Sequence, residues 1–262
     1  IAGGVNMSAG LSMNIGAEIT SPTQDQQATG TFTDTTSEAR VGDSNNTVST
    51  AWGDYDNDGY LDLFVVNQNY NGVLYHNNGN GTFTDVTLGA GMTSTSIYGQ
   101  GVVWADFNRD DYLDLYVSVP YNGCVLYQNN GNGTFTNVVV AAGVYYLNNH
   151  IFGTTTADYD GDGDLDLFSS MYYGSPDILA ANNGSGVFTS VTSAANLSGL
   201  YYGHSSAWAD YDGDGDLDVY VAHETGSVLY RNNGNGTFTN VTAVANVVNT
   251  GSARGVAWGD YD

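Results

Sequence analysis

An aspartate-rich phrase recurs at a nearly constant interval along this 262-residue chain. Its copies begin at Asp54, Asp106, Asp158, Asp210 and Asp260, so the intervals are 52, 52, 52 and 50 residues. The first copy reads Trp-Gly-Asp-Tyr-Asp-Asn-Asp-Gly-Tyr-Leu-Asp-Leu from Trp52 onward, and the fifth stops at Asp262. A fixed period of this size indicates a repeat architecture in which each period forms one supersecondary unit.

A second phrase recurs in step with the first. It reads Asn-Asn-Gly-Asn-Gly-Thr-Phe at residues 77–83 and returns, with small changes, at 129–135, 182–188 and 232–238. Asn-Gly flanked by strand-forming residues is a strong signal for a β-hairpin. Residues 30–34 repeat the end of this phrase, which indicates part of an earlier copy.

Each period is predicted to contain four short strands, because β-branched and aromatic residues are concentrated between the two phrases. In the second period these strands are expected at 101–105, 113–117, 125–127 and 134–138. Four strands in about 50 residues is the size of one propeller blade. The predicted fold is an all-β propeller of about five four-stranded blades. It is either a closed ring, an arc of a larger propeller, or an arc completed by another chain.

The repeats divide the chain into two parts. Residues 30–262 are predicted to form tandem blades, whose aspartate loops start at 54, 106, 158, 210 and 260. Residues 1–29 fit the period poorly and are expected to form a degenerate N-terminal strand region or an arm.

The aspartate loops have the ligand pattern of a calcium site. We number each loop from its first aspartate, so that carboxylates stand at positions 1, 3, 5 and 9, and position 7 offers its backbone carbonyl. Hard oxygen ligands in a flexible loop suit Ca²⁺, and glycine at position 6 permits a sharp turn. Position 12 lacks the glutamate of an EF-hand, since Val65 stands there.

The candidate ligands come from four loops and a fifth, incomplete copy. They are Asp54, Asp56, Asp58, Tyr60 and Asp62 in loop one (54–62); Asp106, Asn108, Asp110, Tyr112 and Asp114 in loop two (106–114); Asp158, Asp160, Asp162, Asp164 and Asp166 in loop three (158–166); Asp210, Asp212, Asp214, Asp216 and Asp218 in loop four (210–218); and Asp260 and Asp262 in the fifth copy.

Loop two departs from the pattern. Asn108 replaces a carboxylate, Asp111 replaces the glycine, and Arg109 brings a positive charge into the loop. We therefore expect about four Ca²⁺ ions, with weaker binding in loop two. Twenty of the 28 acidic residues lie in these phrases, and four Ca²⁺ ions would change the net charge from −24 to −16.

Together the two phrases resemble FG-GAP/VCBS repeats, with the closest similarity to repeats of the cartilage acidic protein and ASPIC/UnbV type. The similarity covers roughly residues 30–262. It implies a β-propeller that holds calcium between the first and second strand of a blade, as in integrin α-subunit heads. The same positions of this chain are then the calcium ligands.

The charge of the chain restricts its partners. Its only basic residues are four arginines, and the net charge of −24 disfavours nucleic acid and anionic membrane surfaces. No apolar stretch is long enough for a membrane-spanning helix, so membrane insertion is not expected. The single cysteine, Cys124, lies in an apolar stretch and is expected on a half-buried strand.

No catalytic constellation is evident, so an enzyme is not expected. The four histidines, His76, His150, His204 and His223, occupy non-equivalent places in the repeats. The first hypothesis is an extracellular, secreted adhesion or structural module that binds proteins or glycans of the cell surface or matrix and self-associates through its ends. The second is a lectin-like propeller, because Tyr98, Phe152 and Tyr202 recur before successive first strands. The third is a polysaccharide lyase.

Overall fold

In the computed structural model, residues 33–42, 45–68, 71–92, 100–119, 123–144, 150–172, 176–197 and 202–259 are described. Within these residues the chain forms four four-stranded antiparallel sheets, each with its strands in sequence order. The predicted region 1–29 and the fifth-copy aspartates Asp260 and Asp262 lie outside the described residues.

The sixteen described strands have lengths of 7, 6, 5 and 3 residues in the first, third and fourth sheets, and of 5, 6, 7 and 3 residues in the second. The first sheet consists of β1 (Thr47–Gly53), β2 (Asp62–Asn67), β3 (Val73–Asn77) and β4 (Phe83–Asp85). The second consists of β5 (Gly101–Ala105), β6 (Asp114–Val119), β7 (Gly123–Asn129) and β8 (Phe135–Asn137). The third consists of β9 (Ile151–Ala157), β10 (Asp166–Met171), β11 (Ile178–Asn182) and β12 (Phe188–Ser190). The fourth consists of β13 (Gly203–Ala209), β14 (Asp218–His223), β15 (Val228–Asn232) and β16 (Phe238–Asn240).

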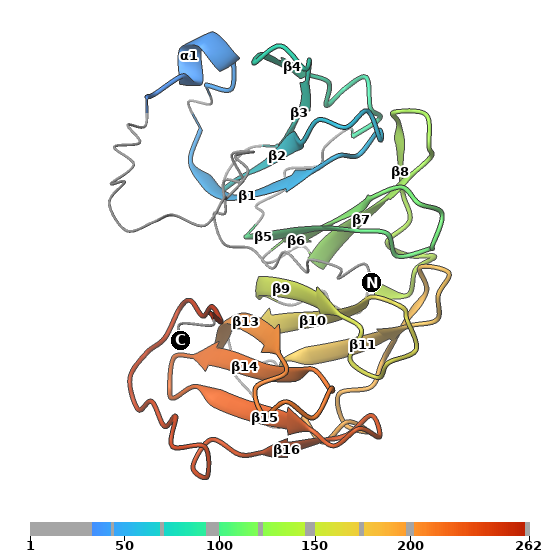
Figure 1. Ribbon diagram of the computed structural model, residues 1–262. Helices are drawn as coiled ribbons and strands as arrows, with labels where there is room; N and C mark the ends of the chain where they lie inside the picture. Colours follow the sequence, from blue (N-terminus) through green and yellow to red (C-terminus); the bar gives the residue numbers. More distant parts are fainter. Residues whose placement is uncertain are drawn as a thin grey trace, which may run out of the picture.

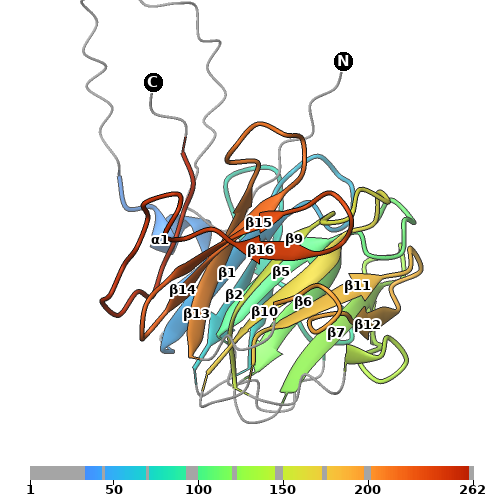
Figure 2. The same ribbon diagram turned by 90° about the horizontal axis from the view of Figure 1, so that it is seen from below.

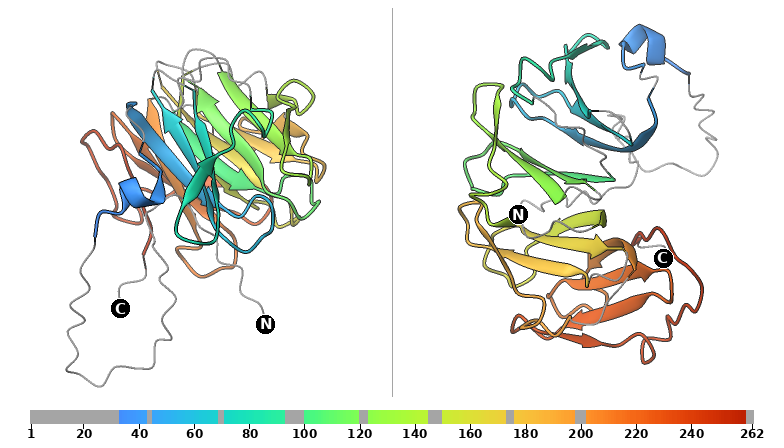
Figure 3. Two further views of the ribbon diagram at one scale, coloured as in Figure 1. Left: turned by 90° about the horizontal axis from the view of Figure 1, so that it is seen from above. Right: turned by 180° about the vertical axis from the view of Figure 1, so that it is seen from behind.

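The structure confirms the all-β prediction and four strands in each period. The predicted strand 101–105 has the bounds of β5. Relative to the other predictions, β6 begins one residue after 113 and ends two after 117, β7 extends beyond both ends of 125–127, and β8 is shorter than 134–138. Figure 1 shows the four sheets following one another as blades along an arc, from the first in blue to the fourth in orange and red. The same order is seen from behind in Figure 3, and Figure 2 shows the blades packed face against face.

Three apolar cores lie between successive sheets. Phe64 of the first sheet packs with Leu115 and Val117 of the second. Tyr116 on the other face of β6 packs with Leu167 of the third sheet. Every residue of β2, β6 and β10 is buried, because these strands are covered on both faces. This burial accounts for the consecutive apolar residues 63–66 in β2 and 115–117 in β6, whereas β10 buries two adjacent serines, Ser169 and Ser170.

Each blade ends in a short helical turn that contacts the next blade. The turn after β4 closes with a hydrogen bond from Ala90 N to Val86 O, and the next residue, Gly91, has a φ of 77°. Its Ala90 carbonyl accepts a hydrogen bond of 2.8 Å from Phe135 N of the second blade. Equivalent bonds join the second blade to the third and the third to the fourth, at 2.9 Å each.

The helix α1 (Thr36–Ala39) repeats this turn ahead of the first described sheet. Ala39 N donates to Thr35 O at 2.8 Å, Arg40 has a φ of 62°, and Val41 packs against Leu63 and Val65. Residues 34–41 are therefore the end of a preceding blade, in agreement with the earlier copy inferred from residues 30–34.

Residues 255–259 take the place of a first strand beyond the fourth sheet. Trp258 Nε1 donates to the Ala207 carbonyl of β13 at 3.1 Å, just as Trp104 Nε1 of β5 donates to the Ala51 carbonyl of β1 at 3.3 Å. The Trp258 ring also meets Tyr220 edge to face. The described chain thus contains four complete blades with a part of a further blade at each side.

Candidate metal centres

Each aspartate loop joins the first strand of a blade to the second and is closed by its own carboxylates. In loop one, Asp54 accepts hydrogen bonds from Asp58 N at 3.0 Å and Gly59 N at 2.9 Å. The carboxylate at position 1 binds the backbone in the same way in the other three loops. Position 1 thereby wraps the loop around a common centre.

Two loop positions adopt left-handed backbone geometry. Position 6 has a φ of 89° at Gly59 and 69° at Asp111, which confirms the need for a turn residue there. Position 4 is left-handed as well, with a φ of 59° at Asn57 and 60° at Arg109. Loops three and four have glycine at position 4, where no strain arises. This requirement at position 4 was not predicted from the sequence, although Gly161 and Gly213 stand there in loops three and four.

The aspartate at position 9 is buried at the start of each second strand. Asp62, Asp114, Asp166 and Asp218 are at most 2% exposed. Each accepts two backbone hydrogen bonds, one from position 2 of its loop and one from the asparagine that ends the third strand; for Asp166 these donors are Tyr159 at 3.2 Å and Asn182 at 2.8 Å. Position 9 therefore fastens the loop to two strands of its blade.

Burial of these four carboxylates costs more than their hydrogen bonds recover. It raises the pKa of Asp62 to about 6 and the pKa of Asp114 and Asp166 to about 7, despite the hydrogen bonds that favour the charged form. The pKa of Asp218 is raised by the same cause. Burial and neighbouring aspartates also raise the pKa of Asp56 and Asp160 at position 3. A bound cation would remove this electrostatic penalty.

Three loops bring ligand oxygens close enough to share one ion. The carboxylates of Asp54, Asp56 and Asp58 meet within 4.8 Å, as do those of two further groups. These groups are Asp158, Asp160 and Asp166 in loop three and Asp210, Asp212 and Asp218 in loop four. Asp56 Oδ1 is buried and has no hydrogen-bond partner. Each group includes at least one buried or half-buried carboxylate, and clustered carboxylate oxygens of this kind fit a hard metal ion.

The other predicted ligands have different partners. Asp58, Asp162 and Asp214 at position 5 each accept a hydrogen bond from the backbone N–H of position 7. At position 7 only the backbone carbonyl is a predicted ligand, and the side chain lies over a hairpin glycine instead. A Cβ built on Gly184, whose φ is 76°, would stand 2.7 Å from Asp164 Oδ2. Glycine in the second phrase therefore makes room for the metal loop.

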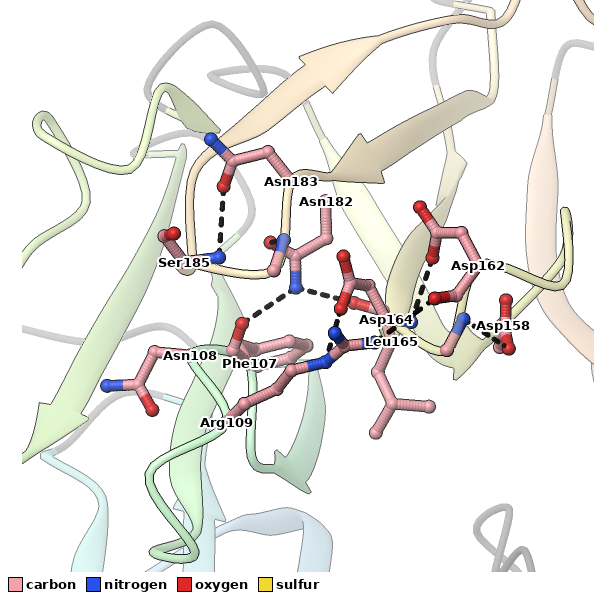
Figure 4. Close-up of polar contacts among 12 residues, drawn as sticks. Phe107, Asn108, Arg109, Asp158, Asp162, Asp164, Leu165, Asn182, Asn183 and Ser185 are labelled. Atoms are coloured by element: carbon pink, nitrogen blue, oxygen red, sulfur yellow. Dashed lines mark hydrogen bonds and ion pairs between the residues drawn. The ribbon is translucent and has the colours of Figure 1, made fainter.

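Loop two is closed by contacts within itself. Asn108 Nδ2 donates to Asp110 Oδ2 at 2.9 Å, and Asn108 Oδ1 accepts a hydrogen bond from Asp110 N at 3.2 Å. Arg109 turns away from its own loop, forms an ion pair with Asp164 and donates to the Asp162 carbonyl at 3.2 Å (Figure 4). The arginine expected to weaken loop two thus contacts loop three. The case for weaker binding in loop two rests on Asn108 and Asp111.

The asparagine that ends each third strand connects two blades. Asn182 Nδ2 donates to Leu165 O of its own blade at 3.1 Å and to Phe107 O of the preceding blade at 2.8 Å (Figure 4). Asn129 and Asn232 do the same toward Tyr55 and Tyr159. The accepting residue is always position 2 of the preceding metal loop. We call this contact the asparagine clamp.

The sequence of the chain matches the FG-GAP-like repeat pattern at residues 24–65, 54–117, 116–169, 158–221 and 210–262. The chain belongs to the FG-GAP-like repeat family. The first four matches end at intervals of 52 residues, which is the period of the metal loops, and the matches together cover the four complete blades. Each described blade is one copy of this repeat, and for this reason its aspartate loop stands at the same place in all four blades.

Among curated proteins, the chain is similar to cartilage acidic protein 1. The human protein is 32% identical over 110 residues and the mouse protein 34% over 109 residues. Each match covers 41% of this chain but only 16% and 17% of the respective relative. The matched segment thus spans about a sixth of the length of these relatives.

Two solved structures share part of the fold. One is an Agrocybe aegerita lectin, studied for its recognition of non-reducing terminal N-acetylglucosamine, with 22% identity and a TM-score of 0.45. The match covers 73% of this chain and 50% of the lectin. The other is the V. cholerae biofilm matrix protein Bap1, with 15% identity, a TM-score of 0.42, and coverage of 71% and 27%.

Proposed function

We propose that the loops hold Ca²⁺ and that this chain is a calcium-stabilised propeller module for adhesion or structural interactions outside the cell. About four ions are expected, one in each of loops one to four, with the weakest in loop two. The ligands offered are carboxylate and carbonyl oxygens, which suit Ca²⁺. Asp260 and Asp262 would belong to a further loop.

The asparagine clamp is the observation that carries this proposal. Its acceptor in the second blade is the carbonyl of Phe107, between the candidate ligands Asp106 and Asn108. An ion that orders this loop would therefore also order the contact with the next blade. Metal binding is in this way linked to cohesion between blades, as expected of a scaffold.

The extracellular location follows from the supply of calcium. Sites of this type in extracellular modules are filled at millimolar calcium, which the cytosol lacks. The chain also carries a net charge of −24, and bound calcium would reduce the self-repulsion of this charge. We propose proteins or glycans of the cell surface or matrix as partners, together with self-association. No helix within the described residues is long and apolar enough to cross a membrane.

Thermal unfolding with and without calcium tests the scaffold. A chelator is expected to lower the melting temperature by more than 10 °C, since several ligated ions stabilise the folded state by mass action. Excess Ca²⁺ should restore the melting temperature, whereas equal Mg²⁺ should restore it only in part, because Mg²⁺ demands a tighter octahedral shell. Identical melting curves in chelator and in calcium would contradict the proposal.

Carbohydrate binding is the second candidate, and a group of aromatic side chains favours it. Phe152, Tyr172, Tyr202 and His204 are linked by ring contacts of 4.8–5.8 Å at the third and fourth blades. Tyr172 also donates to the Glu224 carboxylate at 3.1 Å. These residues lie where the first strands begin and the second strands end, opposite the metal loops. Aromatic faces beside a carboxylate can stack on and hydrogen-bond to a sugar.

A glycan array separates the two candidates. If the aromatic group binds sugar, the chain should bind a defined set of glycans, and Tyr202→Ala should abolish that binding, since Tyr202 is 38% exposed. Tyr60→Ala is the matched control, because Tyr60 is 48% exposed but lies in metal loop one. Binding of no glycan would remove the second candidate. Tyr98, the other predicted aromatic, lies outside the described residues.

A further inference from the structure

A histidine on the neighbouring strand β3 places a nitrogen donor beside loop one, which the other described metal loops lack. His76 lies on β3, and its Nδ1 atom stands 3.3 Å from both Asp56 Oδ2 and Asp62 Oδ1. The three ligand atoms lie within 4.8 Å of one another. They come from three segments: the loop itself, the start of β2 and the end of β3.

His76 Nδ1 lies near both carboxylates without a hydrogen bond to either. It is buried and has no hydrogen-bond partner, and neither has Asp56 Oδ1, the second oxygen of the Asp56 carboxylate. A charge-assisted hydrogen bond between imidazole and carboxylate would be about 2.7–2.9 Å long. By contrast, a metal ion about 2.1 Å from each of two donors that are 3.3 Å apart would subtend about 104°, between octahedral and tetrahedral angles.

The four blades provide an internal comparison. His76 pairs with Thr84 across β3 and β4, and the residues in the same register of the other blades are Gln128, Ala181 and Arg231. Neither an alanine nor an arginine can ligate a cation, and a glutamine offers only its amide oxygen. Of the four described loops, loop one alone has an imidazole at this place.

We propose that Asp56, Asp62 and His76 form a mixed nitrogen–oxygen site for a borderline divalent metal ion such as Zn²⁺, Co²⁺ or Ni²⁺. Imidazole favours these ions over calcium, which takes oxygen ligands. Asp56 also belongs to the all-oxygen group with Asp54 and Asp58, so loop one holds one kind of ion at a time. Loops three and four keep calcium because their donors are oxygen only.

Cobalt titration in saturating calcium tests the site, with the visible absorption of bound Co²⁺ as the readout. The full chain is expected to bind one equivalent of Co²⁺ at millimolar Ca²⁺. His76→Gln, which copies the second blade, should weaken Co²⁺ binding at least tenfold. Calcium-dependent melting should change little, which shows that the variant is folded.

Ala181→His provides the complementary test. It places an imidazole in the same register beside Asp160 and Asp166 of loop three, so a second equivalent of Co²⁺ should bind. The proposal is overturned if the wild-type chain gives no ligand-field spectrum, which would leave His76 as a neighbour of the two carboxylates without a shared ion. It is equally overturned if His76→Gln binds Co²⁺ as tightly as the wild type.

This inference rests on loop one being a metal site but not on calcium binding. A chain that binds Co²⁺ through His76 and melts alike in calcium and chelator would overturn only the proposed calcium scaffold. A chain that calcium stabilises and that shows no Co²⁺ spectrum would overturn only the mixed site.

Discussion

At the scale of single residues, the clamp asparagine contributes to two blades at once. Asn129, Asn182 and Asn232 are at most 6% exposed, and each satisfies two carbonyls with its amide group. The side-chain amide of Asn77, in the first described blade, donates only to Leu61 O of its own blade among the described residues. Asparagine at this position is therefore expected to contribute different amounts to the free energy of unfolding in different repeats.

This difference gives a matched pair of substitutions. Asn182→Ala should lower the free energy of unfolding by about 2–4 kcal/mol, because two buried carbonyls lose their donor. Asn77→Ala should lower it by less than about 1 kcal/mol, since its single bond is exposed. Denaturant unfolding in saturating calcium measures both values. Equal losses in the two variants would show that the clamp adds nothing across the blade interface.

Cys124 is a second residue whose environment determines its behaviour. It is 8% exposed, donates to the Val144 carbonyl at 3.3 Å, and burial raises the pKa of its thiol from 9.0 to about 11. The thiolate is the reactive form, and a higher pKa means that it appears only at higher pH. The expectation of a half-buried strand residue is corrected to a buried one on β7.

The thiol should therefore react slowly with a disulfide reagent in the folded chain. At pH 8 the pKa change alone lowers the thiolate fraction about 100-fold, and burial slows the reaction further. Full reactivity should return in denaturant. Fast, stoichiometric labelling of the native protein would mean that β7 opens readily.

At the scale of elements, loops two and three are linked although their ligand sets differ. Arg109 of loop two neutralises Asp164 of loop three, so one position-7 carboxylate is already paired before any ion binds. Asn57 of loop one makes an equivalent link with a shorter side chain: its Nδ2 donates to the Asp111 carbonyl of loop two at 3.0 Å. Position 4 thus joins consecutive loops wherever it has a side chain.

Loop two can be converted to the pattern of loops three and four. The double substitution Asn108→Asp and Asp111→Gly supplies a carboxylate at position 3 and relieves the left-handed backbone at position 6, where φ is 69°. Calorimetric titration should then show loop two binding calcium at least tenfold more tightly. The control Asn183→Asp adds the same charge as Asn108→Asp alone, but in the hairpin turn after β11, and should leave the calcium affinity of loop two unchanged.

At the scale of the whole molecule, stability comes from interfaces between neighbouring blades. The second and third sheets have an apolar core on both faces, shared with a complete blade on each side. The first sheet shares such a core with the second sheet, while its other face meets Val41 in a smaller cluster. Trp52 is accordingly 48% exposed, whereas Trp104 packs into the core between the first two blades.

Hydrogen exchange should show this difference in packing between the first sheet and the second and third sheets. Backbone amides of β6 and β10 are expected to exchange more slowly than those of β2, because the first sheet has a large apolar core on one face only. Exchange followed by mass spectrometry in saturating calcium measures the order. Faster exchange in β6 than in β2 would mean that blades unfold independently of their neighbours.

The sequence by itself determined what is local. The period, the four strands of each blade and the curled aspartate loops were predictable, because the ligands lie within nine residues and glycine at position 6 permits the turn. The repeat at 30–34 predicted part of an earlier copy, but not the helical turn that follows it at 34–41. Whether the loops bind calcium, and how tightly, stays a prediction.

Only the tertiary structure decided which distant residues meet. The clamp joins Asn129 to Tyr55 across 74 positions, the arginine link joins Arg109 to Asp162 across 53, and His76 reaches loop one from β3. These contacts depend on how one sheet packs on the next, and no local pattern specifies that packing. For this reason the sequence drew attention to His76 and Arg109 but could not predict which residues they contact.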